Sequence, residues 1–328
     1  MIHKLSIRNF KSIRELDLDC RRVNVFIGEP NAGKTNILES LALRSAGCLA
    51  NFREVLRISS FTDLYLDLDV DNSIRVTLNE SPLFFKIEPQ EIVAVFQQPT
   101  GNGHQAYRLT KQLDVLPNTI GLNDSRFSET INYYLFKPLE EFRGEGVKSL
   151  AAPFGDNLFN LLYSNKSARQ TASAFFQNTG FKLNIDLSGR ELKVAKMIED
   201  FLISLPYNGS SETLRRMIFY SLALETNNKQ ILVFDEPEAH SFPPYTKTLA
   251  ERIALDDRGN QFFLTTHSPY MLDSLLSKTS AKDLNVVLCR MENFETKAYP
   301  LNQEQIDQLK EWRMDAFFNF DRLLPEVR

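Results

Sequence analysis

The segment with the clearest chemistry is a loop rich in small residues near the N-terminus. It reads Gly28-Glu29-Pro30-Asn31-Ala32-Gly33-Lys34-Thr35, which fits the pattern G-x-x-x-x-G-K-[ST] without interruption. In this pattern the glycines let backbone N–H groups point at phosphate oxygens, the lysine reaches the β- and γ-phosphates, and the hydroxyl holds Mg²⁺. The loop therefore predicts a nucleoside triphosphate site, with Lys34 on the phosphates and Thr35 on the metal.

The segments on either side of the loop favour this interpretation. Residues 23–27 form a short apolar run typical of a strand, and residues 36–43 have apolar positions at helical spacing. The N-terminus of that helix and its dipole would face the phosphates. The alternative is a glycine-rich turn before an ordinary helix. It is less favoured, because a strand before the loop and a helix after it are the flanks that a phosphate loop requires.

A second segment supplies two carboxylates at the end of a strand. Residues 231–234 are apolar throughout, which is typical of a strand buried on both faces, and Asp235 and Glu236 follow directly. Ligands of open α/β sheets bind at the carboxyl ends of the strands. We expect Asp235 to hold Mg²⁺ through water, and Glu236 to orient or deprotonate the attacking water.

A third segment ends in a histidine. Residues 261–265 predict another apolar strand, and Thr266, His267 and Ser268 follow it. A single histidine is most often structural. At the carboxyl end of a strand that neighbours the one before Asp235, His267 is a candidate for contact with the γ-phosphate.

Strand patterns dominate the first third of the chain. Residues 63–70 alternate most cleanly, and Asp67, Asp69 and Asp71 follow the alternation. These carboxylates could suggest a metal site, but alternation sends every second residue to water, so the exposed face of an antiparallel strand is the favoured interpretation. The strands expected in this part are 2–9, 14–19, 23–27, 63–70, 73–78, 83–87, 92–97 and 106–109.

The rest of the chain completes one predicted domain. Residues 110–205 have a mixed and mostly helical pattern, and a hairpin over 284–290 and 294–299 precedes a helical end. The strand patterns before the loop and before the later motifs fit one shared sheet, so we expect an α/β fold with a single composite domain over 1–328. Its parts would be a phosphate-loop and β-rich lobe (1–109), a helical insert (110–205) and a lobe with the later motifs (206–328).

Composition is ordinary for a globular protein. Of 328 residues, 43% are apolar and 24% charged, and no apolar run approaches the ~20 residues that span a bilayer. The alternating N-terminus lacks the apolar core of a signal peptide. Cys20, Cys48 and Cys289 are scattered and odd in number, which fits a reducing compartment. We expect a cytoplasmic protein without a membrane partner.

The charge balance gives no overall basic footprint for nucleic acid. There are 38 Lys and Arg residues against 42 Asp and Glu residues, a net charge of −4. A basic cluster near the start is favoured as the solvated side of edge strands, while DNA contact through it stays possible. The cluster comprises Lys4, Arg8, Lys11, Arg14, Arg21 and Arg22.

Together the motifs resemble the ABC-class ATPases of the RecF, SMC and OLD (overcoming-lysogenization-defect) group, in a compact form without coiled-coil arms. The matching runs are spread along nearly all the chain and are specific in combination. They are Ile7-Arg8-Asn9-Phe10-Lys11-Ser12, the phosphate loop with Asn36, Pro153-Phe154-Gly155-Asp156-Asn157-Leu158, Asp235-Glu236-Pro237-Glu238-Ala239-His240 and Thr265-Thr266-His267-Ser268-Pro269.

The resemblance implies an ABC-ATPase-type phosphate-loop fold with an antiparallel β subdomain and an inserted helical lobe. It also implies that two protomers sandwich two ATP molecules head to tail with Mg²⁺. One chain's loop and the other chain's signature segment would hold each ATP. The implied residues are Gly28 to Asn36 and Ser210 for the nucleotide, Thr35 and Asp235 for the metal, and Glu236 and His267 for catalysis.

The signature segment departs from the group's pattern. If Ser210 is the signature serine, Glu212 stands where the group has glycine, and a carboxylate near a triphosphate is unfavourable. Phe242 stands where many OLD-like members have a second histidine. Gln97 or Gln98, at the end of an apolar strand, are candidates for the group's Q-loop glutamine.

Three functional hypotheses follow. The favoured one is an ATPase whose nucleotide cycle closes a dimer and controls a separate effector, a nuclease or toxin in anti-phage defence or DNA maintenance. The others are a non-catalytic ATP-dependent scaffold or sensor, and a RecF-like repair ATPase that binds DNA. A Toprim nuclease domain is not expected in the roughly 60 residues after Pro269. A nuclease set of Asp186, Glu191 and Lys193 is a triplet common in charged chains.

Overall fold

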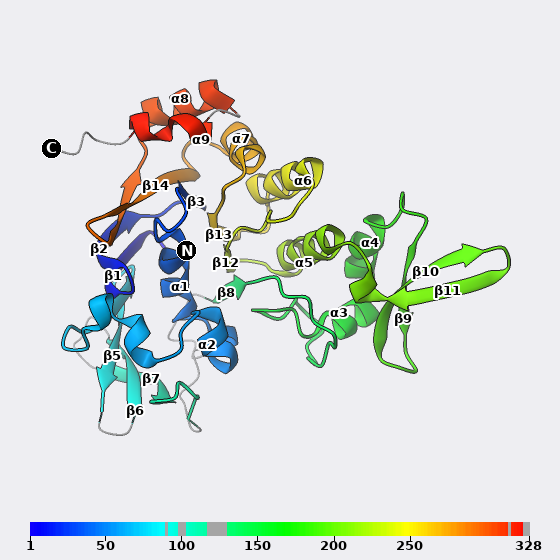
Figure 1. Cartoon of the computed structure of the whole chain (residues 1–328), viewed down its shortest axis with the longest axis horizontal. Helices are drawn as coiled ribbons and strands as arrows, with labels where there is room; N and C mark the ends of the chain where they lie inside the picture. The colour runs from blue at the N-terminus through cyan, green and yellow to red at the C-terminus, as the bar shows by residue number, and fades with distance from the viewer. Residues whose placement is uncertain (89–90, 98–102, 117–129, 314–315, 324–328) are drawn as a thin grey trace.

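The chain folds as a mixed α/β protein, and its described residues form three sheets (Figure 1). The computed structural model describes residues 1–88, 91–97, 103–116, 130–313 and 316–323. The expected α/β class is confirmed. None of the helices in these ranges combines the length and the apolar composition that a membrane span needs.

The core sheet carries all three sequence motifs. Its order is β15-β14-β3-β13-β12-β8, and its neighbours are parallel except for β15 at one edge. The strands β3, β12 and β13 are buried along their length, which explains their unbroken apolar runs. The six strands are β3 (Val23–Gly28), β8 (Ile131–Tyr134), β12 (Ile231–Phe234), β13 (Gln261–Thr265), β14 (Leu284–Glu292) and β15 (Glu295–Pro300).

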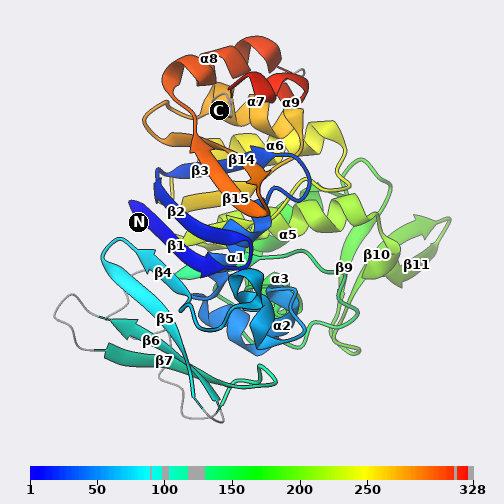
Figure 2. The same cartoon turned by 60° about the vertical axis from the view of Figure 1, so that its left-hand side comes forward.

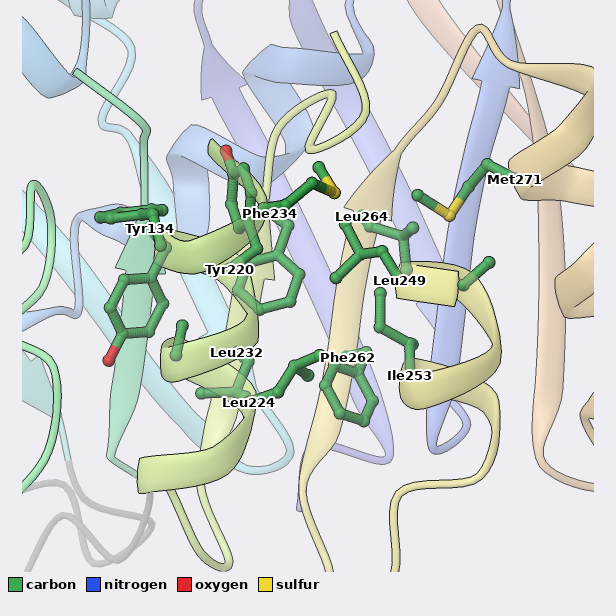
Figure 3. Close-up of a cluster of buried hydrophobic side chains, with 14 of the residues drawn as sticks. Tyr134, Tyr220, Leu224, Leu232, Phe234, Leu249, Ile253, Phe262, Leu264 and Met271 are labelled. Carbon is green, nitrogen blue, oxygen red and sulfur yellow. The ribbon is translucent and has the colours of Figure 1, made fainter. Parts of the chain in front are cut away.

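Alternate side chains of the core sheet supply two hydrophobic clusters. Leu232 and Phe234 of β12 belong to the cluster that also contains Tyr220, whose ring centroid lies 5.2 Å from that of Phe234 (Figure 3). Val233, between them in sequence, belongs to the second cluster, on the opposite face. Helices α5 (Glu212–Thr226), α6 (Pro243–Ala254) and α7 (Pro269–Lys278) line the first cluster, and α1 (Lys34–Ala42) lines the second.

An antiparallel sheet covers the α1 side of the core sheet (Figure 2). Its order is β2-β1-β4-β5-β6-β7, so the two strands that open the chain lie at one edge. Apart from 63–70, the strands predicted here are confirmed within a few residues. They are β1 (Lys4–Phe10), β2 (Ile13–Asp19), β4 (Arg75–Leu78), β5 (Ser81–Ile87), β6 (Glu91–Gln97) and β7 (Gly103–Thr110).

The strand predicted over 63–70 is wrong. The segment forms two 3-10 turns, η2 (Phe61–Leu64) and η3 (Leu66–Leu68), and Asp67 and Leu68 both have positive φ. Three consecutive residues, 64–66, are buried, so the sequence alternation does not follow burial. The aspartates are exposed on a turn and not on a strand face.

The mostly helical pattern predicted over 110–205 is wrong for the part of this segment that the structure describes, 110–116 and 130–205. There the helices are α3 (Leu158–Ser164) and α4 (Lys166–Ala174), while β8 joins the core sheet. Three further strands form a sheet of order β11-β10-β9, which extends away from the body of the molecule (Figure 1). These strands are β9 (Lys182–Asp186), β10 (Glu191–Ile198) and β11 (Phe201–Pro206).

The C-terminal part follows the prediction. The expected hairpin is β14 and β15, and it extends the core sheet past β3. The helix after the loop, α1, ends at Ala42, one residue before the end of the helical pattern over 36–43. The remaining elements of the described residues are η1 (Ala46–Asn51), α2 (Phe52–Val55), η4 (Tyr207–Gly209), α8 (Gln303–Trp312), α9 (Ala316–Asn319) and η6 (Phe320–Leu323).

Candidate nucleotide-binding site

The three motifs meet at the carboxyl ends of neighbouring core strands. Strand β3 leads into the phosphate loop, β12 into Asp235 and Glu236, and β13 into His267. Between them lies a pocket of about 480 Å³. Its lining residues are Ser12, Pro30, Asn31, Ala32, Gly33, Lys34, Thr35, Asn36, Arg57, Glu236, His267 and Met291.

The β14–β15 hairpin packs tightly against the loop, which explains the two loop glycines. Gly28 has φ 146°, and a Cβ there would lie 2.1 Å from the carbonyl oxygen of Cys289. Gly33 has φ 80°, and its Cβ would lie 1.7 Å from Oγ1 of Thr296. Any side chain at either position would collide with the hairpin and strain the backbone.

Lys34 starts helix α1 and turns its ammonium group into the loop. Its Nζ donates to the carbonyl oxygens of Gly28, at 3.0 Å, and Glu29, at 2.7 Å. Burial lowers the pKa of Lys34, while the nearby carboxylates of Glu236 and Asp235 act in the opposite direction. Phosphate oxygens would be stronger acceptors for this cation than the two neutral carbonyls.

Thr35 and Asp235 form the part of the site that suits a metal ion. Thr35 Oγ1 donates to Asp235 Oδ1 at 3.1 Å, and Thr265 Oγ1 donates to the same oxygen at 2.5 Å. Burial raises the pKa of Asp235, and the hydrogen bonds from the two threonines oppose this. Hydroxyl and carboxylate oxygens are the donors that Mg²⁺ prefers, so this pair fits the ion. Among the described residues no group of three or more His, Cys, Asp or Glu could hold a metal.

Glu236 and His267 face each other across the pocket. His267 Nε2 lies 3.3 Å from Glu236 Oε1. Their hydrogen bond lowers the pKa of Glu236, more strongly than its partial burial raises it. Glu236 adopts φ 42°, and its N–H donates to Thr265 Oγ1 at 2.9 Å. A backbone in this unfavourable region, fixed by a buried neighbour, is typical of functional positions.

Arg57 and Met291 line the pocket and were missed by the sequence analysis. Arg57 follows α2, and its Nε donates to Oε1 of Glu39 at 2.7 Å. Glu39 lies on α1 and also accepts a hydrogen bond from Lys11 at 2.5 Å. The run around Arg57 has no motif, so the only signal would have been the charged Glu39 on the apolar helix after the loop.

The signature segment lies outside the pocket of its own chain. Ser210 Oγ donates to the carbonyl oxygen of Tyr207 at 2.6 Å, and α5 begins two residues later. Glu212 is in the first turn of α5 and pairs with Arg216 at 3.2 Å. The role of Ser210 stays a prediction.

Two other expected positions lie away from the pocket. Gln97 ends β6 in the antiparallel sheet and not on a core strand, and Gln98 is outside the described residues. Phe242 precedes α6 and is 61% exposed.

The triplet Asp186, Glu191 and Lys193 is brought together on the β9–β10 hairpin. Lys193 Nζ lies 2.7 Å from Asp186 Oδ2 and 2.9 Å from a carboxylate oxygen of Glu191. The N–H groups of Ser188 and Gly189 donate to Asp186 Oδ1. Lys193 holds the pKa of Asp186 well below its usual range. These bonds close the turn and occupy both oxygens of Asp186, which gives the triplet a structural role.

Comparison with known families identifies the chain. A family model described as "AAA domain, putative AbiEii toxin, Type IV TA system" matches residues 96–273, more than half of the sequence. The chain belongs to this AAA-domain family. A second model, "AAA ATPase domain", matches residues 1–76 of this AAA-domain protein.

Curated relatives and solved structures agree with this assignment. The Retron Vc95 probable ATPase of Vibrio cholerae is 23% identical over 229 residues, 64% of this chain and 44% of the relative. The DNA replication and repair protein RecF of Staphylococcus epidermidis is 38% identical over 63 residues, 18% of this chain and 17% of RecF. The matches thus span less than half of the relatives' own lengths.

SMC heads have the same fold. An SMC head bound to the C-winged helix domain of ScpA has a TM-score of 0.56 at 15% identity, covering 94% of this chain and 99% of that one. A Pyrococcus furiosus Smc head domain with an extended coiled coil has a TM-score of 0.57 at 13% identity, covering 94% and 98%. The AAA-domain protein is therefore an ABC-class ATPase of the RecF- and SMC-like type, with the expected phosphate-loop fold.

Proposed function

We propose that this protein binds ATP with Mg²⁺ and hydrolyses it at the pocket between the three motifs. The observation that carries the proposal is the convergence of Lys34, the Thr35–Asp235 pair and the Glu236–His267 pair at the ends of three neighbouring strands. A cation for phosphates, oxygen donors for a metal and a carboxylate base are the parts that phosphoryl transfer to water requires.

Each group has a distinct proposed role. Lys34 and the loop N–H groups bind the triphosphate, and Thr35 and Asp235 hold Mg²⁺, which when bound neutralises charge on the phosphates. Glu236, kept ionised by His267, accepts hydrogen bonds from the attacking water and takes its proton. His267 orients that carboxylate and lies beside the position of the γ-phosphate.

The test is steady-state phosphate release together with sedimentation. We expect the purified protein to release phosphate from ATP in the presence of Mg²⁺, and to sediment as two protomers with a slowly hydrolysed ATP analogue. Dimerisation without turnover would support the scaffold function instead. A protein that shows no turnover and no ATP binding would contradict the proposal.

We further propose that the dimer is the head-to-tail sandwich, with the segment from Ser210 to α5 placed on the partner's ATP. Supporting this, the segment lies outside its own pocket, and no side chain caps the start of α5 at Ser211. An uncapped helix N-terminus offers N–H groups to an anion. Glu212 at that end would repel the triphosphate, and Arg216 offsets part of its charge.

Replacing Glu212 by glutamine should strengthen ATP-dependent dimerisation. The change removes a charge repulsion of roughly 0.5–1 kcal/mol at each of the two ATP molecules, which corresponds to about a five- to thirty-fold lower dissociation constant for the dimer. Analytical ultracentrifugation with the ATP analogue measures this. Glu304→Gln is the matched control, because Glu304 is also an exposed glutamate in the first turn of a helix, α8. Weaker or unchanged dimerisation would show that this segment does not lie against the partner's triphosphate.

We propose that the output of the cycle is passed to a separate effector protein, a nuclease or toxin. The description of the matched family includes a putative toxin, and the Vibrio relative is named as a retron ATPase. ATP-dependent closure changes the relative position of two protomers, so a protein that spans them would sense the nucleotide state. Anti-phage defence or DNA maintenance is the expected setting.

The N-terminal basic cluster has contacts within the protein, which weighs against the RecF-like alternative. Arg8 pairs with Asp17 at 2.7 Å, and Arg14 pairs with Glu295 at 2.5 Å. Arg21 donates to two backbone carbonyl oxygens of the segment 281–284. The cluster stays on the exposed side of the edge strands, as expected, with Lys4, Arg14 and Arg21 exposed, and the pairs of Arg14 and Arg21 also connect β2 and the residues after it to the core sheet.

A further inference from the structure

Two consecutive threonines end strand β13, and each connects the strand to the turn that follows β12. Thr265 and Thr266 are both fully buried. Thr265 accepts the N–H of Glu236 and donates its hydroxyl to Asp235 Oδ1. This first connection belongs to the proposed metal and hydrolysis site.

The second connection runs through Glu238, to which no role is assigned above. Thr266 accepts the N–H of Ser268 at 3.0 Å and donates its hydroxyl to Glu238 Oε1 at 2.5 Å. The same Glu238 oxygen accepts the N–H of His267 at 3.1 Å. Each threonine thus accepts one backbone N–H and donates to one carboxylate, so the direction of every hydrogen bond is fixed.

Glu238 is only 8% exposed. Its other oxygen, Oε2, has no hydrogen-bond partner among the described residues. Both hydrogen bonds found for this carboxyl group with other residues therefore run to the segment that carries His267. Burying a carboxyl group is costly, and burial raises the pKa of Glu238, so a neutral hydrophobic residue would be the cheaper way to fill this position. A buried carboxylate at this position is explained if residues 266 and 267 need it as a hydrogen-bond acceptor.

We propose that Glu238 and Thr266 are positioning residues that hold His267 against Glu236. Together they fix the backbone N–H groups of residues 267 and 268, on both sides of the Cα of His267. Ser268 then caps α7 by accepting the N–H of Met271, so the segment is also held from its other end. The 3.3 Å contact between Nε2 of His267 and Oε1 of Glu236 follows from this arrangement.

The inference rests on the proposed function, because that function assigns ATP hydrolysis to Glu236 and His267. Displacing a catalytic group by about 1 Å can cost ~10²-fold in rate while substrate binding is retained. Neither Glu238 nor Thr266 lines the pocket. Their loss should therefore appear in kcat and not in nucleotide affinity.

The test compares Thr266→Val with Thr266→Ser, and Glu238→Leu with Glu238→Gln. Valine and leucine remove the donor or the acceptor, whereas serine and glutamine keep it. We expect kcat to fall about 10-fold or more in the first variant of each pair, with the Kd for a fluorescent ATP analogue within about two-fold of wild type. The serine and glutamine variants should recover most of the loss. Thr279→Val, at another buried threonine, is the control for loss of a hydroxyl.

A second readout does not depend on hydrolysis. Crystal structures of the nucleotide-free valine and leucine variants should show the Nε2–Oε1 separation of His267 and Glu236 increased beyond 3.3 Å, and those of the serine and glutamine variants should keep it. An unchanged separation with wild-type kcat would overturn the positioning role. If wild type does not hydrolyse ATP, the proposed function fails, but the structural comparison still decides whether Glu238 and Thr266 hold His267.

Discussion

Lys34→Ala is expected to abolish ATP binding at ordinary nucleotide concentrations. The ammonium group of Lys34 is the loop's own cation, and it already lies within hydrogen-bond distance of two loop carbonyls. Charge-assisted hydrogen bonds to phosphate are among the strongest a protein makes, so the Kd for ATP should rise by about 10²-fold or more. Equilibrium titration with a fluorescent ATP analogue measures the change.

A second substitution separates charge from shape at the same position. Lys34→Met keeps the apolar stem of the side chain and removes only the ammonium group, so it should lose binding to the same extent. Lys310→Ala, on helix α8, controls for loss of a lysine elsewhere. If both Lys34 variants bound ATP like wild type, the phosphate loop would not be the nucleotide site.

Glu236→Gln is expected to separate binding from hydrolysis. Glutamine keeps the shape and a polar contact to His267 but cannot take a proton from water. Loss of a general base costs typically 10²–10⁴-fold, so hydrolysis should fall by about 10²-fold or more while the Kd for ATP stays close to wild type. Phosphate release in single-turnover experiments, at enzyme in excess over ATP, gives the chemical step directly.

This variant should also accumulate the ATP-bound dimer. Because turnover ends the ATP state, Glu236→Gln and Lys34→Ala should shift dimerisation, and the affinity for an effector, in opposite directions. Glu304→Gln should behave as wild type. A Glu236→Gln protein that hydrolyses ATP at the wild-type rate would assign the base to another residue and strengthen the scaffold function.

The parts of the site that could be predicted are local in sequence. The phosphate loop and Asp235-Glu236 each combine a fixed chemical pattern with a neighbouring buried strand, and both signals lie within about ten residues. His267 could be placed because its strand pattern is equally clear. The structure brings these segments together at adjacent strand ends, as the rule for open α/β sheets requires.

The features that could not be predicted depend on distant contacts. Arg57 reaches the pocket because Glu39, 18 residues away, holds its guanidinium group. Glu238 and Thr266 are 28 residues apart and meet only when β12 and β13 pair. No short sequence pattern specifies that these two side chains meet, since many polar residues are compatible with a turn.

The errors in secondary structure have similar causes. The alternation over 63–70 fits a strand, but consecutive buried residues and two positive φ angles turn the chain there. Strand β8 is four residues long, and it is stabilised by pairing with β12 and not by its own pattern. In β11 all six residues are exposed, and apolar residues do not alternate with polar ones. The sequence pattern of a half-buried strand is therefore absent.

The position of β3 in the core sheet has a consequence for synthesis on the ribosome. Strand β3 emerges early, yet both its partners, β13 and β14, and the hairpin that abuts Gly28 and Gly33 are made later. At 5–20 residues per second, roughly a quarter of a minute to a minute separates translation of the loop from that of Thr296. Until β13 is made, the apolar strand lacks both of its partners in the core sheet, and the pocket is complete only when Met291 of the hairpin has been made. ATP can therefore bind the complete pocket only late in synthesis.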